Sequence, residues 1–347
     1  MGRQAAARGS HRCPAAHPRQ RQGLFVVNQI FSRIAGWRSR CGWPPEVFAA
    51  LALMLLCIVL SMTTDMFLDW ENIRNIGRQV SINAILATGM TFVIVIGGID
   101  LSVGSVMALS MTVAAGAMLS GVPVPLAAAA ALLVGAMFGV FNGMLIAVAR
   151  LPAIIVTLAT MEIPRGLALL STGGYPQTGL PQTFSSLGRG SIAGLQIPTL
   201  VMLLVVAGGF LLLRHHVAGR YFYAIGGNAT AARFSGVPVA RYQILAYTLS
   251  GLTAAIAGLV LGSRLMSGQP NAGIGYELDA IAAVVLGGAS ITGGSGSVAG
   301  TLIGALTLGV LNNGLNLMDV SPYLQKVLKG AILLAAIPLG MNRRNRG

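Results

Sequence analysis

The chain has 347 residues, of which 54% are hydrophobic and only 9% are charged. Soluble domains carry about 25% charged residues, so this composition, with a mean hydropathy of +0.75, excludes an ordinary soluble domain and indicates a membrane protein. The net charge of +14 does not call for a nucleic acid partner, because the cytoplasmic edges of membrane proteins are rich in arginine and lysine.

The first 45 residues are rich in arginine, proline, glycine and serine and contain no long apolar run. We predict that 1–45 form a mostly disordered cytoplasmic extension, with a transit peptide or an over-extended start as alternatives. A signal peptide is disfavoured, because the charged region is too long and no clear small-residue cleavage site follows it. The three cysteines, Cys13, Cys41 and Cys57, have neither a disulfide pattern nor metal-site spacing.

Residues 46–340 are predicted to form an all-α transmembrane domain. A helix needs about 20 apolar residues to cross a bilayer. Apolar runs divided by polar breaks predict about ten transmembrane helices, at residues 47–64, 80–97, 105–119, 123–149, 151–172, 197–213, 242–267, 278–286, 298–317 and 326–338. With the N-terminus inside, most arginine clusters fall on the cytoplasmic side, and the turn-rich segments 173–196 and 268–277 are external loops.

A weak internal repeat links the two halves of this domain. The glycines around Asn142 and the glycines around Asn313 occur in similar apolar runs, and each run is followed by a proline, at an offset of about 170 residues. Five spans in each half, 46–172 and 197–340, would give two inverted-topology repeats with a pathway at their interface. Chance similarity between glycine-rich apolar runs is the alternative.

The segment 214–241 is the longest strongly basic interruption between apolar runs and contains no acid. Asn228 is a typical helix N-cap, and Gly236 followed by Pro238 is a typical stop signal. We therefore predict a short capped helix at the cytoplasmic face that receives force from another subunit. A solvated loop that merely connects two spans is the alternative.

Asp100 lies in a glycine-rich break between two predicted spans. A carboxylate at membrane depth costs about 2.5–3.5 kcal/mol on insertion scales, so it needs a partner. We expect Asp100 to cap the amides of residues near Ser102 to Gly104. Contact with a transported molecule is the alternative for Asp100, and Ser102 is a candidate for lining the same pathway.

Four further polar residues are candidates for a pathway. Glu277 and Asp279 begin a predicted span, where the helix dipole favours acids, and a gating role is the alternative. For Asn142 and Asn313 we expect hydrogen bonds between helices, with lining of the pathway as the alternative.

Signatures of enzymes are missing from the sequence. It contains no G-x-S-x-G and no H-E-x-x-H motif, and the glycine-rich run 293–300 lacks the Gly-Lys-Ser/Thr of a phosphate-binding loop. We therefore expect no catalytic, cofactor-binding or metal-binding residues in this chain, and a membrane enzyme is the least favoured class.

Several long motifs, in order, resemble the bacterial ABC-transporter permeases of the ribose/xylose/arabinose/galactoside branch. The resemblance covers about residues 47–338 and rests on GGIDLSVGSVMAL (97–109), YAIGGNATAARFSGV (223–237), QPNAGIGYELDAIAAVVLGGASITGGSGSVAGTLIGAL (269–306) and GVLNNGLNLMDVSPYLQKVLKG (309–330).

The resemblance implies a lipid-embedded homodimer in the bacterial inner membrane. It also implies a cytoplasmic ATPase with two nucleotide-binding domains and a periplasmic sugar-binding protein that meets the external loops. On this basis the coupling helix against the ATPase consists of Gly227, Asn228, Ala229, Arg233, Phe234, Ser235 and Gly236.

Import of a monosaccharide by alternating access is the mechanism that this resemblance implies. A ribose-like pentose is favoured, with xylose, arabinose, galactosides or a furanosyl signalling molecule as alternatives. The rival class is an ion-coupled secondary transporter, which would also show inverted repeats and a wet aspartate but would act without an ATPase.

Overall fold

The computed structural model describes residues 45–341, and it gives side-chain surroundings for 46–331. The chain divides into the units Met1–Trp43 and Pro44–Gly347, and all the described helices belong to the second unit. The expected N-terminal extension lies outside the described residues, apart from its last residue, Pro45.

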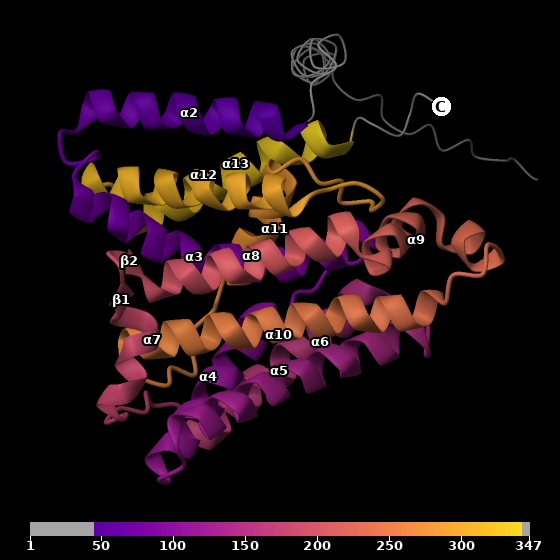
Figure 1. Cartoon of the computed structure of the whole chain (residues 1–347), viewed down its shortest axis with the longest axis horizontal. Helices are drawn as coiled ribbons and strands as arrows, with labels where there is room; N and C mark the ends of the chain where they lie inside the picture. The colour runs from indigo at the N-terminus through magenta and orange to yellow at the C-terminus, as the bar shows by residue number, and fades with distance from the viewer. Residues whose placement is uncertain (1–44, 342–347) are drawn as a thin grey trace, which may run out of the picture. The chain divides into compact units, whose positions relative to one another are not determined.

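The described part of the chain is helical almost throughout (Figure 1). Its first half contains α2 (Pro45–Thr63), α3 (Trp70–Val95), α4 (Val103–Leu119), α5 (Val124–Ala147) and α6 (Ala153–Thr172). A connecting segment follows with η1 (Gln182–Phe184), α7 (Ser185–Arg189) and a hairpin of β1 (Ser191–Ile192) and β2 (Leu195–Gln196), whose antiparallel register pairs Ser191 with Gln196. The second half contains α8 (Ile197–His215), α9 (Val217–Phe234), α10 (Val239–Leu265), α11 (Tyr276–Leu286), α12 (Val298–Leu317) and α13 (Pro322–Met341).

The all-α membrane class is therefore confirmed, while within the described residues fewer than ten helices meet the length and composition of a full span. Within the described residues, seven helices are long and apolar enough to cross a membrane: α2, α3, α5, α6, α8, α10 and α12. The other three expected spans coincide with α4, α11 and α13. Of these, α4 is an apolar helix of only 17 residues, and α11, with 11 residues, is too short to cross a bilayer by itself.

The short length of α11 is explained by the glycines at its C-terminal end. Gly287 ends the helix, and a Cβ added there would collide with the backbone of Gly300. Gly288 then adopts a φ of 92°, in the left-handed region that favours glycine. Backbone contact with α12 therefore replaces the further helical turns that a full span would need.

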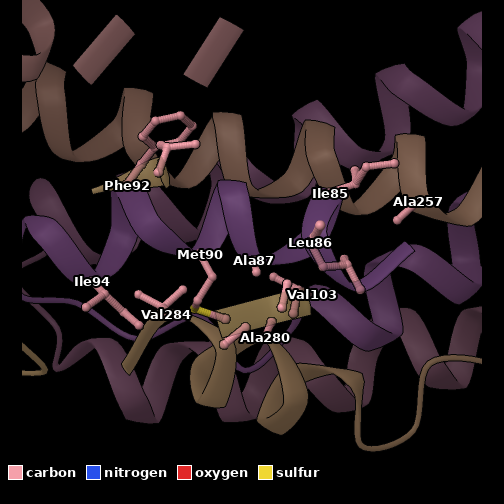
Figure 2. Packing of buried hydrophobic residues seen from close by; sticks show 14 of the residues in the cluster. Ile85, Leu86, Ala87, Met90, Phe92, Ile94, Val103, Ala257, Ala280 and Val284 are labelled. Atoms are coloured by element: carbon pink, nitrogen blue, oxygen red, sulfur yellow. The ribbon is translucent and has the colours of Figure 1, made fainter. Parts of the chain in front are cut away.

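The core of the bundle forms around α3 and α10. Of the most apolar 18-residue window of α3, 83% is buried, compared with 6% for α2. Helix α3 packs against α8, α10, α11 and α12, and α10 also packs against α4 and α5. Figure 2 shows the buried side chains that join these helices, among them Ile85, Leu86, Met90 and Ile94 of α3, Val103 of α4, Ala257 of α10, and Ala280 and Val284 of α11.

Helices α5 and α10 meet backbone to backbone along a row of glycines. A Cβ added at Gly135 would collide with the carbonyl of Gly251, and one added at Gly139 would collide with the carbonyl of Tyr247. One added at Gly143 would lie 2.6 Å from the Cα of Ile244. The order of these contacts makes the two helices antiparallel, and small residues allow this close approach inside a membrane.

Candidate coupling and pathway sites

Asp100 is buried in the linker between α3 and α4, with 1% of its surface exposed. Its Oδ1 accepts hydrogen bonds from the backbone N–H of Ser102 (3.0 Å) and from the Ser102 hydroxyl (2.6 Å). Its Oδ2 accepts one from the hydroxyl of Ser250 on α10, at 2.8 Å. The expected capping role is confirmed, with Ser102 as the capped amide, and charge-assisted bonds of this kind are strong.

Neighbouring helices extend this network. Asn142 of α5 donates from Nδ2 to the Ser102 hydroxyl at 2.9 Å. The expected bond thus reaches the α3–α4 linker, at the residue that precedes α4, and not a second helix. Thr157 of α6 donates to the carbonyl of Ile99 at 3.2 Å. Four parts of the chain, the α3–α4 linker, α5, α6 and α10, are thus tied around one carboxylate.

Asn313 forms a second buried polar contact between helices. Its Nδ2 donates to Oδ1 of Asn72 at 2.7 Å, and Nδ2 of Asn72 donates back to Oδ1 of Asn313 at 3.1 Å. Asn72 also donates to the carbonyl of Phe67 at 2.9 Å. The expected bond between helices is confirmed for Asn313, and it joins α12 to α3.

Glu277 and Asp279 lie in the first turn of α11 and are partly exposed. Glu277 Oε1 accepts a hydrogen bond from the backbone N–H of Gly275 at 3.1 Å. Asp279 Oδ2 forms an ion pair with Lys329 Nζ of α13 at 3.0 Å. The acids therefore stabilise the start of the helix and connect it to α13.

The predicted capped helix within the basic segment is confirmed in the second part of α9. The backbone at Asn228 is non-helical, with φ −158° and ψ 103°, so α9 consists of two helices that meet there. Asn228 Oδ1 accepts hydrogen bonds from the N–H groups of Thr230 and Ala231, both at 3.0 Å. Gly236, with φ 83°, follows the helix in the left-handed conformation.

The surface of this short helix is open. All seven residues expected to form the coupling helix are exposed, and 88% of the Phe234 side chain is accessible. Exposed arginines lie within it and on both sides of it along the chain: Arg214, Arg220, Arg233 and Arg241. An exposed aromatic side chain among cations is typical of a protein contact surface.

Just before the short helix, the chain touches the ends of two central elements. A Cβ added at Gly226 would collide with the carbonyl of Val95 and with the N–H of Gly294. That same N–H donates to the Val95 carbonyl at 2.9 Å. The turn at Asn228 is therefore in backbone contact with the C-terminal end of α3 and with the loop that precedes α12.

Tyr223 adds a side-chain link between α9 and the same loop. Its hydroxyl donates to the Gly296 carbonyl at 2.7 Å. Burial raises the pKa of Tyr223, and the nearby Glu46 carboxylate raises it further. The hydroxyl therefore keeps its proton, and the link persists across the neutral pH range.

Several partners of these polar groups were not expected from the sequence. Asn72, Ser250 and Lys329 each contact a candidate residue that lies far away along the chain. Thr157 contacts the carbonyl of Ile99, the residue before Asp100. A polar residue inside an apolar run signals a contact, but it does not say with which other residue. Within 45–341, no group of three His, Cys, Asp or Glu residues is arranged to hold a metal ion.

Comparison with known proteins places the chain among transport proteins. A family model described as "Branched-chain amino acid transport system / permease component" matches residues 72–337. A ribose import permease protein of Bacillus subtilis (strain 168) is 49% identical over 291 residues, covering 83% of this chain and 90% of the relative. The ribose import permease protein of Haemophilus influenzae is 45% identical over 291 residues, with the same two coverages.

A more distant relative carries another pentose. The L-arabinose ABC transporter permease protein of Azospirillum brasilense is 38% identical over 297 residues, which cover 85% of this chain and 87% of that protein. No solved structure gives a significant match. The chain thus belongs to the family of permease components of branched-chain amino acid transport systems, a family of transport subunits rather than enzymes, and it is similar there to ribose and L-arabinose permeases.

Proposed function

We propose that this chain is the membrane-spanning permease of an ATP-binding-cassette importer for a ribose-like pentose in the bacterial inner membrane. The observation that carries the proposal is the identity of 45–49% to ribose import permeases over 83% of the chain. Identity to the arabinose permease is lower, at 38%, which favours ribose over that sugar. A separate cytoplasmic ATPase with two nucleotide-binding domains supplies the energy, and a periplasmic binding protein delivers the sugar.

The coupling segment, Gly227–Gly236, is the proposed contact with the ATPase. Its support is the open helix capped by Asn228, the accessible Phe234 ring and the basic surroundings. Because Gly226 lies in backbone contact with Val95 and Gly294, a displacement of the segment reaches α3 and the loop before α12 without an intervening side chain.

Two inverted-topology repeats, 46–172 and 197–340, form part of the proposal. In the proposed repeats, α3 corresponds to α10, α4 to α11 and α5 to α12. The packing of the helices follows the same correspondence, because α5 packs on α10 as α12 packs on α3. Likewise, α4 packs on α5 and α10, and α11 packs on α12 and α3. Gly89 of α3 lies beside Thr253, while Gly98, after α3, lies beside Tyr247. The matched helices α3 and α10 are therefore antiparallel, as inverted repeats require.

A second copy of the chain completes the proposed pathway, and membrane lipid surrounds the pair. Exposed apolar side chains along α2, such as Leu55 and Met62, fit a lipid contact. Of the pathway candidates, Glu277 and Asp279 are partly exposed. For the buried Asp100, Ser102, Asn142 and Asn313 we propose that they hold the helices together.

Transport in reconstituted vesicles tests this function. Vesicles containing the permease, its ATPase, internal ATP and external binding protein should accumulate labelled ribose, whereas vesicles with the permease alone should not. Uptake by the permease alone under an ion gradient would instead support the ion-coupled transporter and reject the proposal.

The coupling assignment has a separate test. We expect Arg233→Glu to abolish uptake and ATPase stimulation while leaving membrane insertion intact, because it reverses one charge on the open helix. Arg150→Glu is the matched control, since Arg150 is also an exposed arginine but lies outside the coupling segment. Normal transport by Arg233→Glu would count against the coupling role.

A further inference from the structure

Glu162 is an exposed carboxylate halfway along a membrane-spanning helix. It is the tenth of the 20 residues of α6, which places it about 14 Å from the first residue of the helix at a rise of 1.5 Å per residue. Among the seven candidate spans, α6 alone carries an acid in its middle third, Glu162. An ionised group in that position is strongly disfavoured in contact with lipid tails.

Within the described residues, Glu162 has no direct hydrogen bond or ion pair, although the charge of Arg165, three residues further along α6, acts on it. The one ion pair in that part of the chain is Asp279 with Lys329. Arg165, one turn away, is already engaged, because its Nη1 donates to the carbonyls of Pro270 (2.7 Å) and Ala272 (2.6 Å). The Arg165 guanidinium keeps its charge but donates its printed hydrogen bonds elsewhere, so direct hydrogen bonds to the Glu162 oxygens are left for groups outside a single copy of the chain.

The polar side of α6 is continuous with an external loop. The Arg165 guanidinium ties α6 to the predicted external loop 268–277, and the charges of Glu277 and Glu162 both act on it. Polar groups thus extend from that loop, through Arg165, to Glu162 at mid-depth.

A dry contact between two copies does not suit this residue. In a twofold dimer any patch on one copy that lies near the axis faces the same patch on the other. Two Glu162 carboxylates that approach each other in a dry interface would repel strongly, whereas water or hydroxyl groups between them would solvate both.

From these observations we infer that Glu162 lines the water-filled translocation path and accepts hydrogen bonds from the hydroxyl groups of the passing sugar. The inference rests on the proposed function, because it needs a pathway between two copies. A carboxylate suits this role, since it is an acceptor with two oxygens and a sugar hydroxyl is a donor. Arg165, which is held by the carbonyls of the loop, forms the end of this polar surface nearest to that loop.

Cysteine accessibility tests the location without any sugar. In a cysteine-free chain (C13S, C41S, C57S), Glu162→Cys should react with a membrane-impermeant thiol reagent in vesicles that contain the assembled permease and ATPase. Ile163→Cys is the matched control, because Ile163 is 49% exposed but lies about 100° around the helix. We expect labelling at Glu162→Cys on the order of tenfold faster, since only a thiol in water forms the reactive thiolate.

Two outcomes of this labelling would overturn the inference. One is equal rates at the two positions, which places Glu162 in lipid. The other is an oxidative cross-link between two Glu162→Cys copies that are closed to the reagent, which makes the position a dry dimer contact.

Transport tests the role in sugar binding. Glu162→Leu should lower ribose uptake roughly tenfold or more, the factor lost with a charge-assisted hydrogen bond. Glu162→Gln, which keeps an acceptor oxygen, should retain most of the uptake and shows that the site tolerates substitution. Wild-type rates in Glu162→Leu, at equal amounts in the membrane, would refute the role. Failure of the unsubstituted chain to import ribose would reject the proposed function, while the labelling result would still place Glu162.

Discussion

At the scale of single residues, buried polar groups hold this membrane protein together. Burying Asp100 is costly, by about 2.5–3.5 kcal/mol on insertion scales. Two serine hydroxyls and one backbone N–H offset that cost by hydrogen bonding to the carboxylate. The local cap at Ser102 could be predicted, because it lies two residues away. The bond to Ser250 spans 150 residues and depends on how α10 packs against the α3–α4 linker.

Removing this carboxylate should destabilise the fold. We expect Asp100→Ala to lower the free energy of unfolding by about 1.5–3 kcal/mol, because it leaves buried donors unpaired. The readout is the melting temperature of the purified protein in detergent. Ser110→Ala is the control, since the Ser110 hydroxyl is buried without a partner in the described structure. This variant should have a melting temperature close to that of the wild type. A melting temperature for Asp100→Ala equal to that of the control would show that the network contributes little.

At the scale of helices, glycines determine which elements touch. The α5–α10 contact depends on glycines such as Gly135 and Gly251, whose backbones meet directly. The same property shortens α11 at Gly287 and brings α9 against Val95 at Gly226. Glycine in apolar runs signals close helix contact in a membrane, but the pairing of α5 with α10 emerges only from the packed structure.

A bulky residue in the glycine row should separate the two helices. Gly251→Leu should lower the yield of correctly folded protein, since overpacking of this kind costs about 1–3 kcal/mol or more. Gly208→Leu provides the comparison, because a Cβ at Gly208 would meet nothing within 4 Å. Size-exclusion chromatography of detergent extracts measures the monodisperse fraction. Equal fractions for the two variants would mean that the contact is not tightly packed.

At the scale of the whole described unit, α8 separates two surfaces of different character. The loop with η1, α7 and the β1–β2 hairpin lies at one end of α8, and α9 lies at the other (Figure 1). The loop of the first surface contains one charged residue, Arg189, which contacts Arg264, and Arg78 binds Gln196 there. The second surface carries the exposed arginines of the coupling segment and of the neighbouring sequence. The proposed function requires the first to face the binding protein and the second to face the ATPase.

The orientation of these two surfaces can be measured directly. In the cysteine-free chain, Tyr175→Cys (77% exposed) should react with an impermeant thiol reagent added outside intact cells. Phe234→Cys (88% exposed) should react only in inside-out vesicles. The reason is that α8 crosses the membrane once between them. Reaction of both positions from the same side would contradict the topology, and with it the assignment of the coupling segment.

The amino-acid sequence alone determined the membrane class, the approximate places of the long apolar helices and the capped helix at Asn228, because apolar runs and caps are local signals. It did not predict α7 or the first part of α9. The sequence also indicated the family, since several long motifs of that family occur in order along the chain. The tertiary structure decided which helices are central, which polar groups pair and why α11 stops after 11 residues. These features depend on backbones and side chains that meet from distant parts of the chain, such as Asn72 with Asn313. The position of Glu162 illustrates the difference: the sequence shows a charge that interrupts a span, and only the packed helices show that it is exposed and unpaired within one copy.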